Sequence, residues 1–239
     1  MKDTLHLYVI IADDNEFAAA KAAAPAPVQD GASFGRESFS FSLAQEGRRA
    51  EVTAVYSRVG KVNAAACAAF AVASGADYIL NAGLSGGISH IGKGELMLAT
   101  RFFEHDFDLA PLGYKKCEKP GQGGELTSCP ALDRLFLNAC PRLKCGAAAT
   151  GDCFVCDDRL RRELAERHGA MSCDMESAAI ASVCADAGVG FSSLRKISDD
   201  AGQDAGSDYQ DAKNQAERSL FSCFFAGVSN VFKADALWD

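Results

Sequence analysis

The chain has 239 residues, of which 48% are hydrophobic and 23% are charged. This composition suits one domain over residues 1–239, with enough apolar side chains for a sizeable core. The formal net charge of −8 and the pI of about 5.1 argue against a nucleic-acid partner, which requires basic clusters. The first residues carry acids and too short an apolar run for a signal peptide or a bilayer span. We therefore expect a cytoplasmic protein with no membrane partner.

Strand-like and helix-like patterns alternate along the chain. Residues 5–12 form a continuous apolar run typical of a strand buried on both faces. Further strands are expected within 48–60, 77–83, 94–108, 145–155 and 190–199. Helices are expected from residue 14 and over 61–75, 158–169 and 208–234, while the Gly- and Pro-rich residues 111–130 predict a long loop. The last helix has an apolar stripe formed by Ala216, Leu220, Phe224, Val228 and Val231.

No stretch is rich enough in linker residues to divide this alternating pattern into domains, so the pattern predicts a single three-layer α/β fold. Ligands of such folds collect at the carboxyl ends of the strands. Polar clusters follow four of the expected strands, at 13–16, 83–89, 174–176 and 198–200. The cluster at 83–89, GLSGGIS, predicts a glycine loop that either makes a tight turn or approaches a ligand with its backbone N–H groups.

The ten cysteines are scattered, and several, such as Cys67, Cys184 and Cys223, lie inside apolar helical stretches. We expect mostly buried free thiols rather than disulfides, which indicates a reducing cytosol. Cys153 and Cys156 form a lone CxxC without a second CxxC or a His pair at zinc spacing. No metal site is therefore expected.

The stretch SCDMESAAIASVC at 172–184 places Asp174 and Glu176 at the start of an apolar helix. Acids stabilise a helix N-terminus by about 0.3–1 kcal/mol, which is one explanation for both. However, small residues follow Glu176, so packing would enclose its carboxylate, and burial without a partner is costly. A sugar diol supplies two hydroxyls to such a carboxylate. We expect Glu176 to bind a sugar and Asp174 to be only a helix-end acid.

Asp199 ends an expected strand in RKISDDAG, opposite Arg195. One interpretation is a surface turn with a local ion pair. The other is a carboxyl whose pKa is raised by burial, so that it can donate a proton. Glu16 likewise is either a first-turn helix acid or a functional one.

Six motifs together resemble the nucleoside phosphorylase/nucleosidase superfamily. In chain order they are SRVGKVNAAA, LNAGLSGGIS, EHDFDLAPLGY, ATGDCFV, SCDMESAAIASVC and LRKISDDAG. The resemblance covers nearly the whole chain and is strongest to the bacterial 5′-methylthioadenosine/S-adenosylhomocysteine nucleosidases. It implies a three-layer α/β/α sandwich around a central mixed β-sheet, and hydrolysis of the N-glycosidic bond of these nucleosides to release adenine. It also implies no cofactor and a homodimer in which the second subunit contributes a segment near Pro120.

The same resemblance implies roles for individual residues. Asp199 would protonate the departing purine at N7, and Glu16 would activate the attacking water with Arg195 nearby. Glu176 would bind the ribose hydroxyls. The residues implied in substrate binding beside Glu176 are Met175 at the sugar, Phe154 and Val155 at the base, Tyr209, Val59, Leu109 and Leu112 around the 5′ group, and Leu84, Ser85, Gly86 and Ser198.

Phosphorolysis is the rival reaction within this superfamily. The phosphorylases resemble one another in a GDPxR turn after the first strand and an arginine entering the glycine loop. Here these places read ADDNEF and LNAGLSGG, so both arginines are missing. Asp13, Asp14 and Glu16 would repel phosphate, and Arg58 is the remaining cation at a plausible height. The sequence therefore favours hydrolysis.

Two residues depart from the nucleosidase pattern. Leu84 replaces a small polar residue that touches the nucleophile, and Asp13 replaces a methionine of the sugar and 5′ pocket. These differences leave two alternatives open, namely another 5′-substituted nucleoside, such as futalosine, and a nucleoside-binding protein with weakened catalysis. The presence of Glu16, Glu176 and Asp199 together favours an enzyme, because binding alone does not need three acids.

Overall fold

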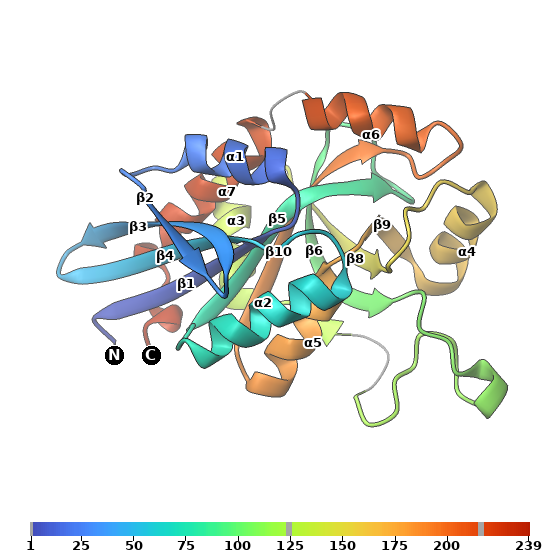
Figure 1. Ribbon diagram of the computed structural model, residues 1–239, viewed down its shortest axis with the longest axis horizontal. Coiled ribbons are helices and arrows are strands. Elements are labelled where there is room, and N and C mark those ends of the chain that lie inside the picture. Colours follow the sequence, from blue (N-terminus) through green and yellow to red (C-terminus); the bar gives the residue numbers. More distant parts are fainter. Residues whose placement is uncertain (1, 123–125, 215–217) are drawn as a thin grey trace.

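A mixed sheet runs through the centre of the molecule and carries helices on both faces (Figure 1). The computed structural model describes residues 2–122, 126–214 and 218–239. Its strands are β1 (Thr4–Ile11), β2 (Gln29–Ser33), β3 (Arg36–Gln45), β4 (Arg48–Tyr56), β5 (Tyr78–Gly87), β6 (Leu96–Glu104), β7 (Leu126–Thr127), β8 (Lys144–Thr150), β9 (Ala170–Asp174) and β10 (Gly190–Asp199). Its α-helices are α1 (Asp14–Ala23), α2 (Lys61–Ala73), α3 (Pro130–Ala139), α4 (Asp158–His168), α5 (Ser177–Ala187), α6 (Ala205–Asn214) and α7 (Arg218–Ser229). Short 3-10 turns are η1 (Ala110–Leu112), η2 (Asn230–Lys233) and η3 (Asp235–Leu237).

The strand order is β10-β6-β8-β9-β5-β1-β4-β3-β2, with β7 beside β6. Strand β10 also pairs with β5, so β5, β10, β6, β8 and β9 close into a ring at one end of the sheet. Because β1 is parallel to β4 and β5, and β5 is parallel to β10, these four strands end at the same edge. Strands β3, β6 and β9 each make antiparallel pairs, so the predicted mixed sheet is confirmed.

Two apolar layers hold the helices on the sheet. Helices α2 and α5 pack against each other through alanines such as Ala64, Ala68, Ala178 and Ala181, which let the two backbones approach closely. On the other face, α1, α3 and α7 cover a core rich in phenylalanine that also buries Trp238. The predicted three-layer α/β/α arrangement is therefore confirmed.

Several predicted elements differ from the observed ones. Strands β2 and β3 and helix α3 were absent from the prediction. The helix expected over 208–234 is described as α6 and α7, and Ala216 of its predicted stripe lies outside the described residues. The predicted glycine loop at 83–89 is wrong for most of its length, because β5 continues to Gly87. This extension is held by β10 on one side and β9 on the other.

The prediction of free thiols is wrong for Cys140 and Cys223, which form a disulfide. Packing of α3 on α7 brings their Cα atoms to 6.3 Å, within the range that a disulfide requires. These residues are 83 positions apart, and their meeting depends on how two helices cross. The other eight cysteines are free, and four of these are buried.

Candidate active site

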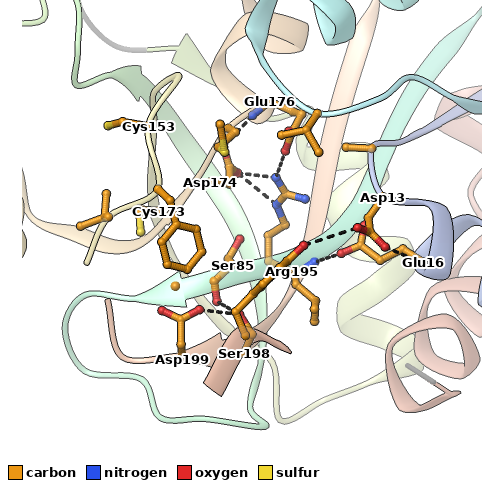
Figure 2. A pocket seen from close by; sticks show the side chains of 18 residues that line it. Asp13, Glu16, Ser85, Cys153, Cys173, Asp174, Glu176, Arg195, Ser198 and Asp199 are labelled. Carbon is orange, nitrogen blue, oxygen red and sulfur yellow. Dashed lines mark hydrogen bonds and ion pairs between the residues drawn. The ribbon is translucent and has the colours of Figure 1, made fainter. Parts of the chain in front are cut away.

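A cleft of about 240 Å³ opens at the edge where β1, β4, β5 and β10 end (Figure 2). The cleft is surrounded by the start of α1, the extension of β5, the end of β10, the junction between β9 and α5, and the loop at 151–157. Tyr209 of α6 also lines it. Its lining residues are Ala12, Asp13, Glu16, Val59, Leu84, Ser85, Gly86, Cys153, Phe154, Val155, Cys173, Asp174, Met175, Glu176, Arg195, Ser198, Asp199 and Tyr209.

All but two of the residues predicted for the site line this cleft. The exceptions are Leu109 and Leu112. The prediction that they line the cleft is wrong, since neither is a lining residue in this chain. Both lie at or beside η1, on the segment after β6 that extends away from the sheet (green in Figure 1). Leu112 is 72% exposed.

Arg195 is the central cation of the cleft. It is 1% exposed, and its Nη2 lies 2.7 Å from Asp174 Oδ2 and 3.3 Å from Glu176 Oε2. Glu176 Oε1 also accepts the Gly60 N–H at 3.0 Å. Burial raises the pKa of Glu176, and the charge of Arg195 only partly offsets that effect.

Asp174 is not only the helix-end acid that the sequence predicted. Its Oδ1 accepts the N–H groups of Glu176 and Ser177 at the start of α5 and the Thr150 hydroxyl at 2.7 Å. Burial acts to raise the pKa of Asp174, but Arg195 and the hydroxyls of Ser177 and Thr150 outweigh it, so that the net pKa is lowered. Asp174 is thus the ionised partner that permits a buried guanidinium.

Glu16 reaches the same region from the first turn of α1. Its Oε1 accepts the Leu84 N–H at 2.7 Å. A Cβ on Gly83 would lie 2.6 Å from Arg195 Nη1 and 2.9 Å from Glu16 Oε2, so only glycine leaves room for these two side chains. Burial raises the pKa of Glu16 to about 8, despite the Leu84 N–H and the charge of Arg195.

Asp199 lies on the opposite side of the cleft from Asp13 and Glu16 (Figure 2). Its Oδ2 lies 2.7 Å from the Ser198 hydroxyl, and its Oδ1 accepts the Ala201 N–H at 2.8 Å. Ala201 has a φ of 53°, an uncommon value for a residue with a Cβ. Burial raises the pKa of Asp199, so the surface turn considered for it does not describe this carboxyl.

Two aromatic rings form the outer wall of the cleft. Phe154 and Tyr209 meet edge-on, with ring centroids 5.6 Å apart and an interplanar angle of 66°. Phe154 is 44% exposed, which leaves ring surface available to a ligand. Ser85 lies deeper, and its buried Oγ has no hydrogen-bond partner within the described residues.

Sequence reasoning missed some lining residues, namely Ala12, Cys153 and Cys173, and it underestimated Asp174. The sequence did contain a signal for the role of Asp174. This acid precedes Glu176 by two residues at the end of a strand, so it lies near the same buried cation, Arg195. For the part of the chain that is described, no three or more His, Cys, Asp or Glu side chains are grouped so as to hold a metal ion. No helix within those same residues is long and apolar enough to cross a bilayer.

Comparison with known proteins identifies the family. Residues 6–228 match the family model described as Phosphorylase superfamily. This chain belongs to that superfamily. An aminodeoxyfutalosine nucleosidase of Campylobacter jejuni is 31% identical over 167 residues, which cover 67% of this chain and 73% of the relative. A 5′-methylthioadenosine/S-adenosylhomocysteine nucleosidase of Geobacillus kaustophilus is 32% identical over 184 residues, covering 71% of this chain and 78% of that superfamily member.

Solved structures of the superfamily share the fold. The 5′-methylthioadenosine/S-adenosylhomocysteine nucleosidase of Helicobacter pylori superposes with a TM-score of 0.88 at 22% identity. The superposition covers 97% of this chain and 100% of that structure. The central sheet with helices on both faces is therefore a fold that this chain shares with that structure.

Replacing Glu16 by Gln is expected to stabilise the protein, and more so as the pH rises. Since the pKa of Glu16 is about 8 in the fold against an ordinary value of 4.5, wild-type stability falls as pH rises between these values. The Gln side chain does not titrate, so the variant does not lose this part of the free energy of unfolding. The loss in the wild type is at most roughly 3–5 kcal/mol above pH 8. Urea unfolding of both proteins at pH 5 and pH 8.5 measures it. A stability difference that stays constant between the two pH values would contradict the raised pKa.

Proposed function

We propose that this protein is a nucleosidase that hydrolyses the N-glycosidic bond of 5′-methylthioadenosine and S-adenosylhomocysteine and releases adenine. The observation that carries the proposal is the convergence of Glu16, Glu176 and Asp199 from distant parts of the chain on one cleft. The nucleosidases among its relatives support the same reaction class. In this proposal the protein acts in the cytoplasm.

Asp199 acts as the general acid in this proposal. Breaking the glycosidic bond leaves negative charge on the purine, which departs more readily once N7 is protonated. Because burial raises the pKa of Asp199, its carboxyl retains a proton to higher pH than an exposed aspartate does. Ser198 and the Ala201 N–H hold the carboxyl in place. General acid catalysis of this kind contributes typically about 10²–10⁴-fold.

Glu176 holds the ribose. Each oxygen of its carboxylate already accepts one hydrogen bond or ion pair, from Gly60 and from Arg195, and a carboxylate oxygen accepts two. One acceptor position per oxygen therefore remains for the two ribose hydroxyls. The same negative charge favours the positive charge that develops on the sugar as the bond breaks. Met175 lies beside Glu176 in the cleft wall and packs against the sugar.

Glu16 serves as the base that activates water, and Arg195 favours its ionised form. Leu84 replaces the small polar residue of the family but still supplies its backbone N–H to Glu16. That contact is independent of the leucine side chain, so the departure at Leu84 leaves the position of the base intact. Catalysis by Glu16 then requires the ionised carboxylate, present in greater part as the pH rises toward 8.

The remaining lining residues provide the walls for the base and the 5′ group. Phe154 stacks on the purine, and the backbone of Val155 reads its edge. Tyr209 and Val59 cover the 5′ side. The hydroxyl of Ser85, which lacks a partner among the described residues, is available to a polar group of the substrate, and Gly86 and Ser198 complete this wall.

Hydrolysis is favoured over phosphorolysis by the charges of the cleft. Its buried cation, Arg195, is already paired with two carboxylates, and Asp13 and Glu16 are also present. Because Asp174 and Glu176 share the single charge of Arg195, phosphate would meet a net negative charge there. Arg58 is exposed and is not among the lining residues.

The proposed reaction predicts specific products. Incubation with 5′-methylthioadenosine, S-adenosylhomocysteine, adenosine and inosine, with and without phosphate, should release adenine and free sugar from the first two in the absence of phosphate. Chromatography of free base and sugar measures this. Sugar 1-phosphate formed only when phosphate is present would identify a phosphorylase instead. Binding without turnover of any nucleoside would favour the nucleoside-binding alternative.

Asp199→Asn should reduce kcat at least 100-fold while retaining nucleoside binding, because the amide keeps the size of the side chain but cannot donate the acidic proton. Steady-state kinetics and calorimetric titration separate the two effects. The matched control is Asp200→Asn, since Asp200 is adjacent but exposed and outside the cleft. Its kcat should stay within about threefold of wild type. An active Asp199→Asn enzyme would remove Asp199 from the mechanism.

A homodimer is part of the proposal. Val62 of α2, Leu112 and Tyr114 are large hydrophobic residues that are 80%, 72% and 41% exposed, and an apolar patch on the surface marks a protein–protein contact. Lys61 connects α2 to the start of the segment that carries the other two, through an ion pair with Asp106 at 2.7 Å. A second copy covering this surface would also bring its own Leu109 and Leu112 toward the 5′ side of the cleft.

Light scattering coupled to gel filtration should give the mass of a dimer for the wild type. Leu112→Asp places a charge on the apolar surface, so it should shift the protein toward the monomer and lower kcat/KM for 5′-methylthioadenosine. Thermal unfolding checks that the variant is folded. A monomeric wild type with full activity would contradict the dimer.

A further inference from the structure

Asp13 in the wall of the cleft forms an ion pair with Lys213, which stands beside the cleft, and the proposed reaction has no use for this pair. Asp13 lines the cleft and is 7% exposed, and Lys213 of α6 places its Nζ 2.6 Å from Asp13 Oδ2. The same Nζ lies 3.1 Å from Asp14 Oδ1. Two carboxylates and one ammonium thus gather at one place on the rim of the cleft.

Capping of a helix does not explain the charge at this position. Asp13 Oδ1 accepts the N–H groups of Asn15 and Glu16 at 2.8 and 3.4 Å, so it caps α1. An uncharged Asn or Ser caps a helix about as well. A methylthio group also gains nothing from a carboxylate in its wall, since the carboxylate must lose water to contact it.

The contact of Asp13 with Tyr209 puts the pair beside the 5′ substituent, because the proposed function has Tyr209 cover that side of the substrate. Figure 2 shows Asp13 and Glu16 on the side of the cleft opposite Asp199. Tyr209, which lines the cleft, has its hydroxyl 3.5 Å from Asp13 Oδ2, at the long limit of a hydrogen bond. A stronger donor from a ligand can replace that weak contact.

The charges of Asp13, Asp14 and Lys213 fit a ligand group that carries both a positive and a negative charge. Lys213 has three N–H donors and uses two of them on Asp13 and Asp14, which leaves one for a ligand carboxylate. Asp14 is mostly open to solvent, with 68% of its side chain exposed. Asp13, Asp14 and Lys213 together carry one net negative charge, which attracts an ammonium and disfavours a lone carboxylate.

We propose that Asp13 and Lys213 recognise the zwitterionic α-amino acid end of a 5′ substituent, with the ligand ammonium at the aspartates and its carboxylate at Lys213. The substrate that this selects is S-adenosylhomocysteine over 5′-methylthioadenosine. The inference rests on the proposed nucleosidase function, which it makes more specific. It assigns selectivity to the residue that departs from the methionine of the family pattern.

The competing explanation is that the pair only fastens α6 over the cleft. A second ion pair offers a matched control, because Lys93, after β5, binds Asp208 in the first turn of α6. This pair also holds α6, but neither Lys93 nor Asp208 lines the cleft, whereas Asp13, the partner of Lys213, does. Loosening α6 through Lys93→Met should affect all nucleosides alike, whereas loss of recognition at Lys213 should affect only those with a charged tail.

The experiment compares kcat/KM for S-adenosylhomocysteine and 5′-methylthioadenosine in the wild type, Lys213→Met, Asp13→Asn and Lys93→Met. Asp13→Asn keeps a capping oxygen for α1 while removing the charge. The ratio of the two kcat/KM values should fall at least tenfold in Lys213→Met and Asp13→Asn and stay within twofold in Lys93→Met. Analogues of S-adenosylhomocysteine that lack only the amino group or only the carboxylate should each be poorer substrates for the wild type.

A ratio that is unchanged in Lys213→Met, or that falls equally in Lys93→Met, overturns the inference and leaves the nucleosidase function standing. An analogue with only a carboxylate that equals S-adenosylhomocysteine would replace the zwitterion with a lone anion as the ligand. If the wild type hydrolyses neither nucleoside, the proposed function fails. In that case the affinities of the same four proteins for both nucleosides are measured by calorimetry. The inference then requires the ratio of the two affinities to fall at least tenfold in Lys213→Met and Asp13→Asn and to stay within twofold in Lys93→Met.

Discussion

Arg195 loses almost all contact with water in this fold, and two acids inside the protein must compensate its charge. Withdrawing an ion from water costs several kcal/mol, so this guanidinium is tolerated only where its partners are placed by the fold. Asp174 at the end of β9 and Glu176 at the start of α5 meet that requirement. Glu16 approaches on the other side, over Gly83. The positions of Asp174, Glu176 and Glu16 in the cleft thus depend on the burial of one cation.

The sequence was sufficient to predict the architecture and the site because its signals were local. The alternation of apolar runs with helical stretches indicated the layers, and polar residues directly after strands indicated the edge where the cleft lies. Glu16, Glu176 and Asp199 each stood at such a place. Their assignment to particular roles came from resemblance to a family, since spacing alone left a capping or turn explanation open for each.

The features that the sequence did not predict depend on contacts between distant segments of the chain. The glycines after Gly83 indicated a loop, but pairing with β9 and β10 keeps them in a strand. Cys140 and Cys223 meet only because α3 packs on α7. The positions of Leu109 and Leu112 outside the cleft follow from the path of the segment after β6, which no local pattern specified.

The ring of β5, β10, β6, β8 and β9 has a consequence for how this protein behaves toward other chains. A strand whose two sides are both occupied offers no free N–H and C=O groups on which a foreign strand can add. The strands that carry Asp174, Arg195 and Asp199 are therefore protected from edge-to-edge aggregation. Apart from the two-residue β7, the open margin of the described sheet is β2, at the far end from the ring and only five residues long. Association by sheet extension at that margin would leave the chemistry of the cleft untouched.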